Sequence, residues 1–260
     1  MKKPVILIIG AGAGIGGNVA RKFADGGYHA CMARRSDGAG LEELVSTIRS
    51  GGGSADGFLV NAIEDEVIES LVDKIENEIG PIEVAVYNLG AQIGNRALSD
   101  TTYKAFETGW RLATFGLFRL ASAICPYMEK RGKGTVIVTS ATAAVRGNSG
   151  QHSHAAAMGG RRMLCQTLNA ELATKGIHIA HVLIDGAVDA PDTLGKILGP
   201  ERFQKLREEK GLERDGLILP DEIAETYFHL AKQHRSAWTH ELDIRAFSDL
   251  AWWNHQTIAI

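Results

Sequence analysis

The segment GQHSHAAAMGG, residues 150–160, places His154 four residues before Met158. Residues i and i+4 share one face of a helix, so both side chains can face the same cleft. A histidine can donate or accept a proton near neutral pH, and apolar surroundings such as Met158 keep its imidazole neutral. The pair predicts a proton-transfer group beside an apolar floor; the alternative is a partly buried histidine without catalytic function.

A second candidate for acid–base chemistry is Asp185, which directly follows the apolar run 178–184. In an open α/β sheet, ligands bind outside the carboxyl ends of the strands, and a carboxylate at that position points toward the crevice. The alternative role of Asp185 is to cap the turn that follows.

The N-terminal segment VILIIGAGAGIGGNVARKFADGG contains an apolar strand, a glycine turn and a helix. This order of elements aims the N–H groups of a helix N-terminus at a phosphate. Gly12, Gly14 and Gly17 fit G-x-G-x-x-G, whereas Gly10, Gly14 and Gly16 fit G-x-x-x-G-x-G. We prefer the second register, because it begins where the strand ends and the tight turn must lie.

At the end of the second apolar run the chain reads MARRSD. A site for NAD usually has an acidic residue here, which accepts a hydrogen bond from the ribose 2′-hydroxyl. Arg34 and Arg35 cannot accept that bond, but guanidinium groups bind a 2′-phosphate well. The two arginines predict a preference for NADP(H) over NAD(H); alternatively, they are solvated residues at the start of a helix.

Short β-branched runs alternate with longer helical patterns and supply the elements that must position these residues. The predicted strands are 5–9, 29–33, 57–60, 83–87, 135–140, 178–184 and 241–246. The predicted helices are 41–49, 64–79, 103–130, 154–174 and 221–233. Apolar strands that are each followed by a helix are typical of a parallel sheet covered on both faces.

The chain has no internal repeat, linker or break in composition, so we expect a single domain over residues 1–260. Its least regular stretch, about residues 189–219, contains two prolines and a charged helix over 201–210. Insertions of this kind are usually lids or binding loops.

The composition is that of an ordinary globular protein, with 45% hydrophobic and 23% charged residues. A formal net charge of −3 gives no strong attraction to nucleic acid or to an anionic membrane. The three cysteines are widely spaced and show no metal-binding pattern, and the first apolar run is too short to span a membrane. We therefore expect a soluble, cytoplasmic protein that binds neither metal nor nucleic acid.

Several ordered segments resemble the classical short-chain dehydrogenase/reductase family. They include Gly10-x-x-x-Gly14-Ile15-Gly16, YNLG at residues 87–90, GTVIVTSATAAVRGNSGQ and LPDEIAETYFHLA. The resemblance extends over nearly the whole chain, from residue 5 to about residue 244. It implies an α/β, doubly wound, Rossmann-type fold with a seven-stranded parallel sheet, and a homodimer or homotetramer built on two long helices.

The resemblance also assigns places around the cofactor. Asn61 stands where an aspartate usually contacts adenine, and Asn88 and Gly90 would lie beside the adenine ribose. The backbone at Val188 would meet the nicotinamide carboxamide. The complete set of expected cofactor-binding residues is Gly10, Gly14, Ile15, Gly16, Arg34, Arg35, Asn61, Asn88, Gly90 and Val188.

The family's catalytic set is Asn, Ser, Tyr and Lys, the last two as Tyr-x-x-x-Lys, and this chain replaces all four. His154 stands at the tyrosine position and Met158 at the lysine position. Ala113 and Ala141 stand at the asparagine and serine positions; a slip of one residue would restore Ser140, but no slip restores the tyrosine and lysine. Because a lysine lowers the tyrosine pKa in the family, the usual proton donor for carbonyl reduction is missing.

Three functions remain open from the sequence. The first is an NADP(H)-dependent oxidoreductase of atypical mechanism, which transfers hydride to an already electrophilic substrate such as an iminium or an enone. The second is a non-redox cyclase, isomerase or dehydratase that uses His154 and Asp185 as an acid–base pair. The third is a pseudoenzyme that senses the cofactor. In the first two, the substrate is a small molecule, which we expect to have an apolar part.

Overall fold

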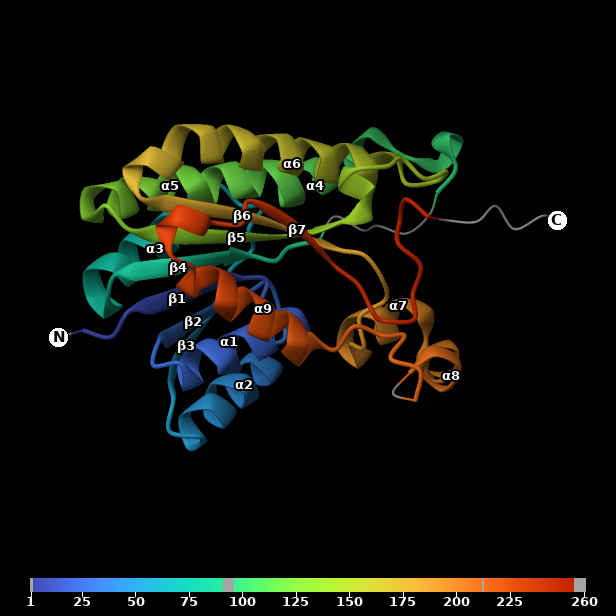
Figure 1. Ribbon diagram of the computed structural model, residues 1–260, viewed down its shortest axis with the longest axis horizontal. Coiled ribbons are helices and arrows are strands. Elements are labelled where there is room, and N and C mark those ends of the chain that lie inside the picture. Colours follow the sequence, from blue (N-terminus) through green and yellow to red (C-terminus); the bar gives the residue numbers. More distant parts are fainter. Residues whose placement is uncertain (1, 91–95, 212, 255–260) are drawn as a thin grey trace.

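The computed structural model describes residues 2–90, 96–211 and 213–254. Its sheet has seven parallel strands in the order β3-β2-β1-β4-β5-β6-β7 (Figure 1). The strands are β1 Val5–Ile9, β2 His29–Arg34, β3 Ser54–Leu59, β4 Ile82–Tyr87, β5 Gly134–Ala141, β6 Ile177–Ile184 and β7 Glu241–Ile244. The predicted doubly wound α/β fold is confirmed, and β1 and β6 carry unbroken apolar or buried runs, as a doubly covered sheet requires.

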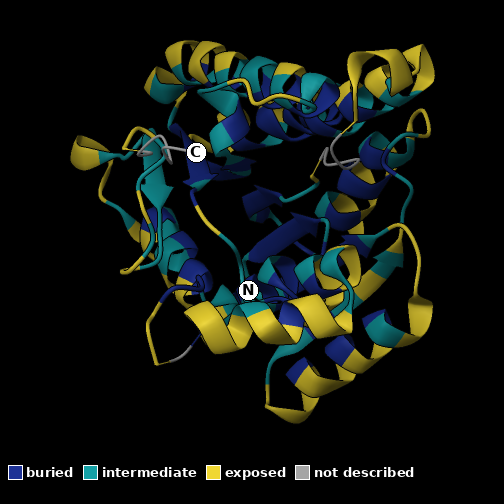
Figure 2. Cartoon of the chain, turned by 90° about the vertical axis from the view of Figure 1, so that its right-hand side faces the viewer, coloured by how far each residue is buried: buried dark blue, intermediate teal, exposed yellow. Residues whose placement is uncertain are grey.

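Helices cover both faces of the sheet (Figure 1). The helices are α1 Ile15–Asp25, α2 Gly38–Ser50, α3 Val67–Lys74, α4 Tyr103–Trp110, α5 Gly116–Arg131, α6 His152–Leu172, α7 Lys196–Leu198, α8 Pro200–Lys210 and α9 Pro220–Lys232. Helices α1, α2 and α9 contribute to one apolar core, and α3, α5 and α6 contribute to the other. Figure 2 shows buried strands between helical layers whose outer faces are exposed.

The long helix predicted over 103–130 is interrupted, which corrects that prediction. A wider, π-type turn, Arg111–Phe115, separates α4 from α5. There the hydroxyl of Tyr87 donates to the carbonyl of Leu112, and the guanidinium of Arg161 donates to the carbonyl of Ala113. These side chains come from outside the helix and bind carbonyls that a regular helix would use itself, which explains the wide turn.

The order of the strands reverses at β1 and β4, and the carboxyl ends of these strands define the crevice where such sheets bind ligands. Helices α7 and α8, from the predicted 189–219 insertion, lie beyond this end of the sheet (Figure 1). Within the described residues, no helix is both long and apolar enough to cross a membrane.

Candidate functional site

The turn between β1 and α1 needs glycine at the two ends of the preferred register. Gly10 has a φ of +100°, which residues with a side chain rarely adopt. A Cβ on Gly16 would lie 2.5 Å from the carbonyl oxygen of Gly10. A Cβ on Gly12 would meet nothing within 4 Å. A Cβ on Gly17 would lie 2.7 Å from the carbonyl oxygen of Gly12, so the last glycine of either register is confined by the turn. Gly16 packs behind the turn and is not among the residues that line the crevice.

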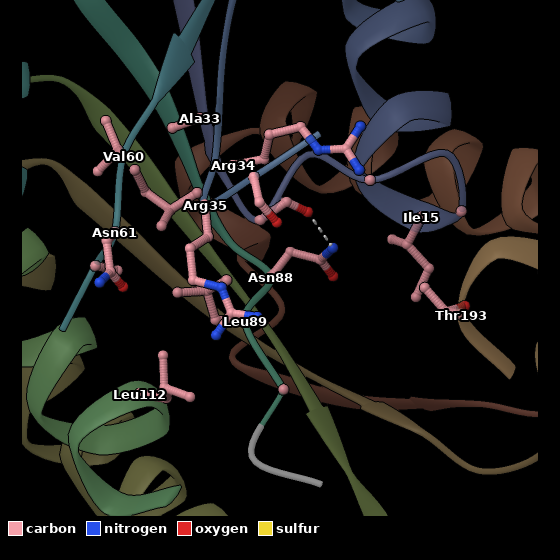
Figure 3. Close-up of a pocket in the computed structure, with 17 residues that line it drawn as sticks. Ile15, Ala33, Arg34, Arg35, Val60, Asn61, Asn88, Leu89, Leu112 and Thr193 are labelled. Atoms are coloured by element: carbon pink, nitrogen blue, oxygen red, sulfur yellow. Dashed lines mark hydrogen bonds between the residues drawn. The ribbon is translucent and has the colours of Figure 1, made fainter. Parts of the chain in front are cut away.

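A cavity of about 420 Å³ opens next to this turn (Figure 3). It is lined by Ile9, Gly10, Gly12, Gly14, Ile15, Ala33, Arg34, Arg35, Ser36, Val60, Asn61, Ala62, Asn88, Leu89, Gly90, Leu112 and Thr193. We refer to it as the first lobe. Both predicted arginines belong to it, and no aspartate or glutamate is among its described lining residues.

The two arginines occupy different parts of the first lobe. The side chain of Arg35 points into the middle of the cavity, between Asn61 and Asn88, whereas that of Arg34 points toward the glycine turn (Figure 3). Arg34 also forms an ion pair of 3.0 Å with Asp37, which caps the N-terminus of α2 by accepting from the backbone N–H of Gly40. An anion bound by Arg34 would thus compete with one half-exposed carboxylate.

Two asparagines give the first lobe its polar contacts. The side-chain amide of Asn88 donates to the carbonyl of Gly10 at 2.9 Å, which ties the end of β4 to the turn after β1. The amide of Asn61 donates to Glu64 at 2.9 Å, and its buried oxygen Oδ1 has no described partner. That oxygen is an open acceptor, of the kind an adenine amino group would satisfy.

A second lobe of about 410 Å³ continues from the first. It is lined by Ile15, Asn88, Leu89, Gly90, Thr139, Ser140, Ala141, His154, Met158, Arg161, Ile184, Gly186, Ala187, Val188, Thr193, Leu194 and Ile197. The lobes share Ile15, Asn88, Leu89, Gly90 and Thr193. The crevice therefore has the form expected for a ligand with two halves, and the predicted residue Val188 lies in its second half.

His154 and Met158 both line the second lobe, so they share one face of the helix as predicted. Met158 is 1% exposed and His154 is 9% exposed. Burial, followed by the charge of Arg161, lowers the pKa of His154, so its imidazole is neutral at pH 7 as expected. Its Nδ1 atom is buried and has no described hydrogen-bond partner, so it remains available to a ligand.

The residues at and beside the expected serine and asparagine positions lie next to this pair. The hydroxyl of Ser140 contacts the thioether sulfur of Met158 at 3.7 Å. Ala141 lies beside it in the lining of the lobe, and Ala113 belongs to the small buried cluster that packs with Met158. The lining of the second lobe contains neither a tyrosine nor a lysine among its described residues.

Arg161 is a residue of the site that the sequence reasoning missed. Its guanidinium is buried at 1% exposure and donates to the carbonyls of Ala113, Thr139 and Leu89. It also lies over the ring of Tyr87, 5.3 Å from the centroid. The available signal was its spacing, because 154, 158 and 161 are positions i, i+4 and i+7 of one helical face.

Asp185 is buried but already engaged. Its Oδ2 atom accepts from Arg245 at 2.9 Å and from the backbone N–H of Trp252 at 2.9 Å. It shares a polar side cavity of about 290 Å³ with His154, but it does not line the second lobe beside Met158. Through these two bonds Asp185 anchors the chain segment around Arg245 and Trp252. The same bonds give little support to the predicted acid–base role of Asp185.

A doubly wound sheet with a glycine turn and a two-lobed crevice at its switch point defines a protein built to bind a nucleotide cofactor. The sequence pattern described as short chain dehydrogenase matches residues 4–193. The chain belongs to this family of NAD(P)-dependent oxidoreductases.

Individual proteins of known sequence or structure are similar to the chain over most of its length. The 7alpha-hydroxysteroid dehydrogenase of Escherichia coli (strain K12) is 27% identical over 84% of this chain and 83% of its own length. The short-chain reductase protein NovJ of Streptomyces niveus is 29% identical, covering 92% and 91%. A solved short-chain dehydrogenase from Rhodopseudomonas palustris is 29% identical, covers 94% of this chain and 99% of its own, and has a TM-score of 0.76.

Proposed function

We propose that the protein is an NADP(H)-dependent oxidoreductase that reduces substrates which are already electrophilic. The observation that carries this proposal is the composition of the crevice. Its first lobe has two arginines and no described carboxylate, and its second lobe has a neutral histidine where the family has a tyrosine. The substrate would be a small molecule such as an iminium or a conjugated enone.

The residues of the first lobe fit the cofactor. The open glycine turn and the N-terminus of α1 would hold the pyrophosphate, and Arg34 and Arg35 would hold the 2′-phosphate. The free Oδ1 atom of Asn61 would accept from adenine. When bound, the cofactor would supply the hydride. The predicted positions Asn88 and Gly90 line both lobes, and Val188 lines the second lobe.

In the second lobe, His154 would orient the substrate or deliver a proton after the hydride. A neutral imidazole can donate from one nitrogen and accept at the other. Loss of general acid catalysis costs roughly a hundred- to ten-thousand-fold in rate, so a ketone would react slowly. An iminium or enone requires little proton donation at the accepting atom and would avoid most of that cost.

The alternative of a non-redox enzyme receives less support from the geometry. It needs Asp185 as a partner for His154, and this carboxylate is bound to Arg245 and to the backbone of Trp252. A cofactor sensor without turnover would have the same first lobe, and only measurements of activity separate it from the proposed oxidoreductase.

Titration with NADPH and NADH, followed by nicotinamide fluorescence, tests the proposal. We expect NADPH to bind at least tenfold more tightly than NADH, because only NADPH carries the 2′-phosphate that the two arginines would bind. Equal affinity would contradict the preference for NADP(H), and no binding of either would contradict the proposed oxidoreductase itself.

A further inference from the structure

The second lobe has one charged side chain among its described lining residues. Among its described lining residues, Arg161 is the one with a formal charge at neutral pH. The others are apolar or uncharged, and His154 is kept neutral by burial. Any group that enters the second lobe therefore meets the field of a single, permanent cation.

This cation is fixed in position and remains charged. Three carbonyls from separate segments accept from its guanidinium: Leu89 after β4, Thr139 in β5 and Ala113 in the wide turn before α5. Burial lowers the pKa of Arg161, but an arginine begins so far above neutral that it stays protonated. Because three backbone carbonyls hold the guanidinium, the side chain of Arg161 has a fixed orientation toward the second lobe.

No carboxylate among the described residues forms an ion pair with Arg161. The neighbours that interact with its charge are Tyr87, Cys165 and Tyr227, and burial raises the pKa of each, so all three are neutral at pH 7. Charges in a buried site are screened much less than charges in water. The positive field of Arg161 therefore persists inside the second lobe.

We propose that Arg161 makes the second lobe select the reduced, uncharged nicotinamide over the oxidised, cationic one. This inference rests on the proposed function, which places the nicotinamide in that lobe. The dihydronicotinamide ring of NADPH is neutral, whereas the ring of NADP⁺ carries a positive charge that the guanidinium repels. The protein would thus load with the hydride donor and release the oxidised cofactor readily.

The preference for NADPH over NADP⁺ is compatible with a substrate that is already electrophilic. Tighter binding of the reduced form raises the potential of the bound couple by about 30 mV for each tenfold preference. Bound NADPH is then a weaker hydride donor than free NADPH. A strongly electrophilic acceptor such as an iminium tolerates this loss better than a simple ketone does.

The test compares dissociation constants for NADPH and NADP⁺ at one ionic strength, measured by calorimetry. We expect the wild type to bind NADPH at least tenfold more tightly. Met158→Glu places a carboxylate three residues from Arg161 on the same helix face and should reduce this preference about tenfold relative to Met158→Gln, which matches it in shape without the charge. Arg161→Lys, which keeps the charge, should retain the preference.

Direct removal by Arg161→Met should abolish the preference, provided that a thermal melt shows a folded protein. Three unpaired carbonyls destabilise this variant, so the Met158 pair carries the test. The same thermal melt is applied to Met158→Glu and Met158→Gln, because Met158 is buried. Equal affinity of the wild type for NADPH and NADP⁺, or the same preference in Met158→Glu and Met158→Gln, would overturn the inference. Failure to bind either cofactor would instead overturn the proposed function.

Discussion

Three side chains on one face of α6 line the same part of the crevice. His154, Met158 and Arg161 occupy positions i, i+4 and i+7, and all three line the second lobe. The first two could be predicted from the sequence, because they fall on the positions of a known motif. Arg161 could not, because its role depends on carbonyls from three segments that only the folded chain brings together.

The first prediction concerns His154. His154→Phe fills the same space without hydrogen-bonding atoms and should abolish turnover of the true substrate. Affinity for NADPH should be nearly unchanged, since His154 does not line the first lobe. Steady-state kinetics together with an NADPH titration would check both parts. Full activity in the variant would show that the histidine only packs.

The second prediction concerns the phosphate contact. Arg34→Asp should weaken the binding of NADPH far more than that of NADH, because it replaces a phosphate ligand with a repelling carboxylate. Arg235→Asp, at an exposed residue before β7, is a matched change of charge away from the cavity. It should leave both affinities unchanged. Equal loss of affinity for the two cofactors in Arg34→Asp would show that this arginine reads no phosphate.

At the scale of elements, the positions of the strands along the chain were predictable from the sequence. The wide turn after α4 was not. All seven predicted strands exist. The central strand β1 is an unbroken, fully buried apolar run, whereas the edge strands β3 and β7 are polar in part and only partly buried. The turn Arg111–Phe115 arises from bonds made by Tyr87 and Arg161, which lie far away in the chain. A pattern within one segment cannot show such distant donors.

The pairing of β6 with β7 leads to a prediction about pH. Burial outweighs the nearby carboxylate of Glu241 and lowers the pKa of His181 to about 4. The unfolded chain therefore binds this proton near pH 6.5, before the folded protein does. Stability is complete above about pH 6.5 and should fall by about 1.4 kcal/mol per pH unit for this group, down to about pH 4.

His181→Asn keeps a donor toward Glu241 but removes the titration. Urea unfolding at pH 6.5 and pH 5 should show that the variant loses about 2 kcal/mol less than the wild type does over this interval. Parallel losses in the two proteins would mean that His181 titrates normally in the folded state.

At the scale of the whole molecule, an exposed apolar surface on α4, α5 and α6 agrees with the predicted homodimer or homotetramer. Tyr103 is 96% exposed, Phe118 51%, Met163 50% and Trp110 42%. Phe115 stacks with both Trp110 and Phe118. Exposed aromatic groups of this size on long helices are typical of a surface that a second copy covers.

Phe118→Glu should shift the protein to a smaller species in light scattering, because it places a charge in the proposed contact. Leu59→Glu, at an exposed residue at the end of β3, is the matched control and should leave the mass unchanged. A wild type that is monomeric at working concentrations would contradict the predicted assembly.

A crevice with His154 and Met158 in place of a tyrosine and a lysine should still reduce an acceptor that is already electrophilic. The most direct measurement follows NADPH oxidation with cyclohexenone, with a cyclic iminium and with cyclohexanone under identical conditions. We predict that the enone or the iminium reacts about a hundredfold faster than the ketone. The ketone oxygen needs a proton during hydride transfer, whereas the iminium needs none and the enolate formed from the enone takes up its proton afterwards. Ketone turnover of about ten per second, the rate of a typical enzyme, would show that the site does supply a proton to a carbonyl oxygen and would contradict the proposed preference.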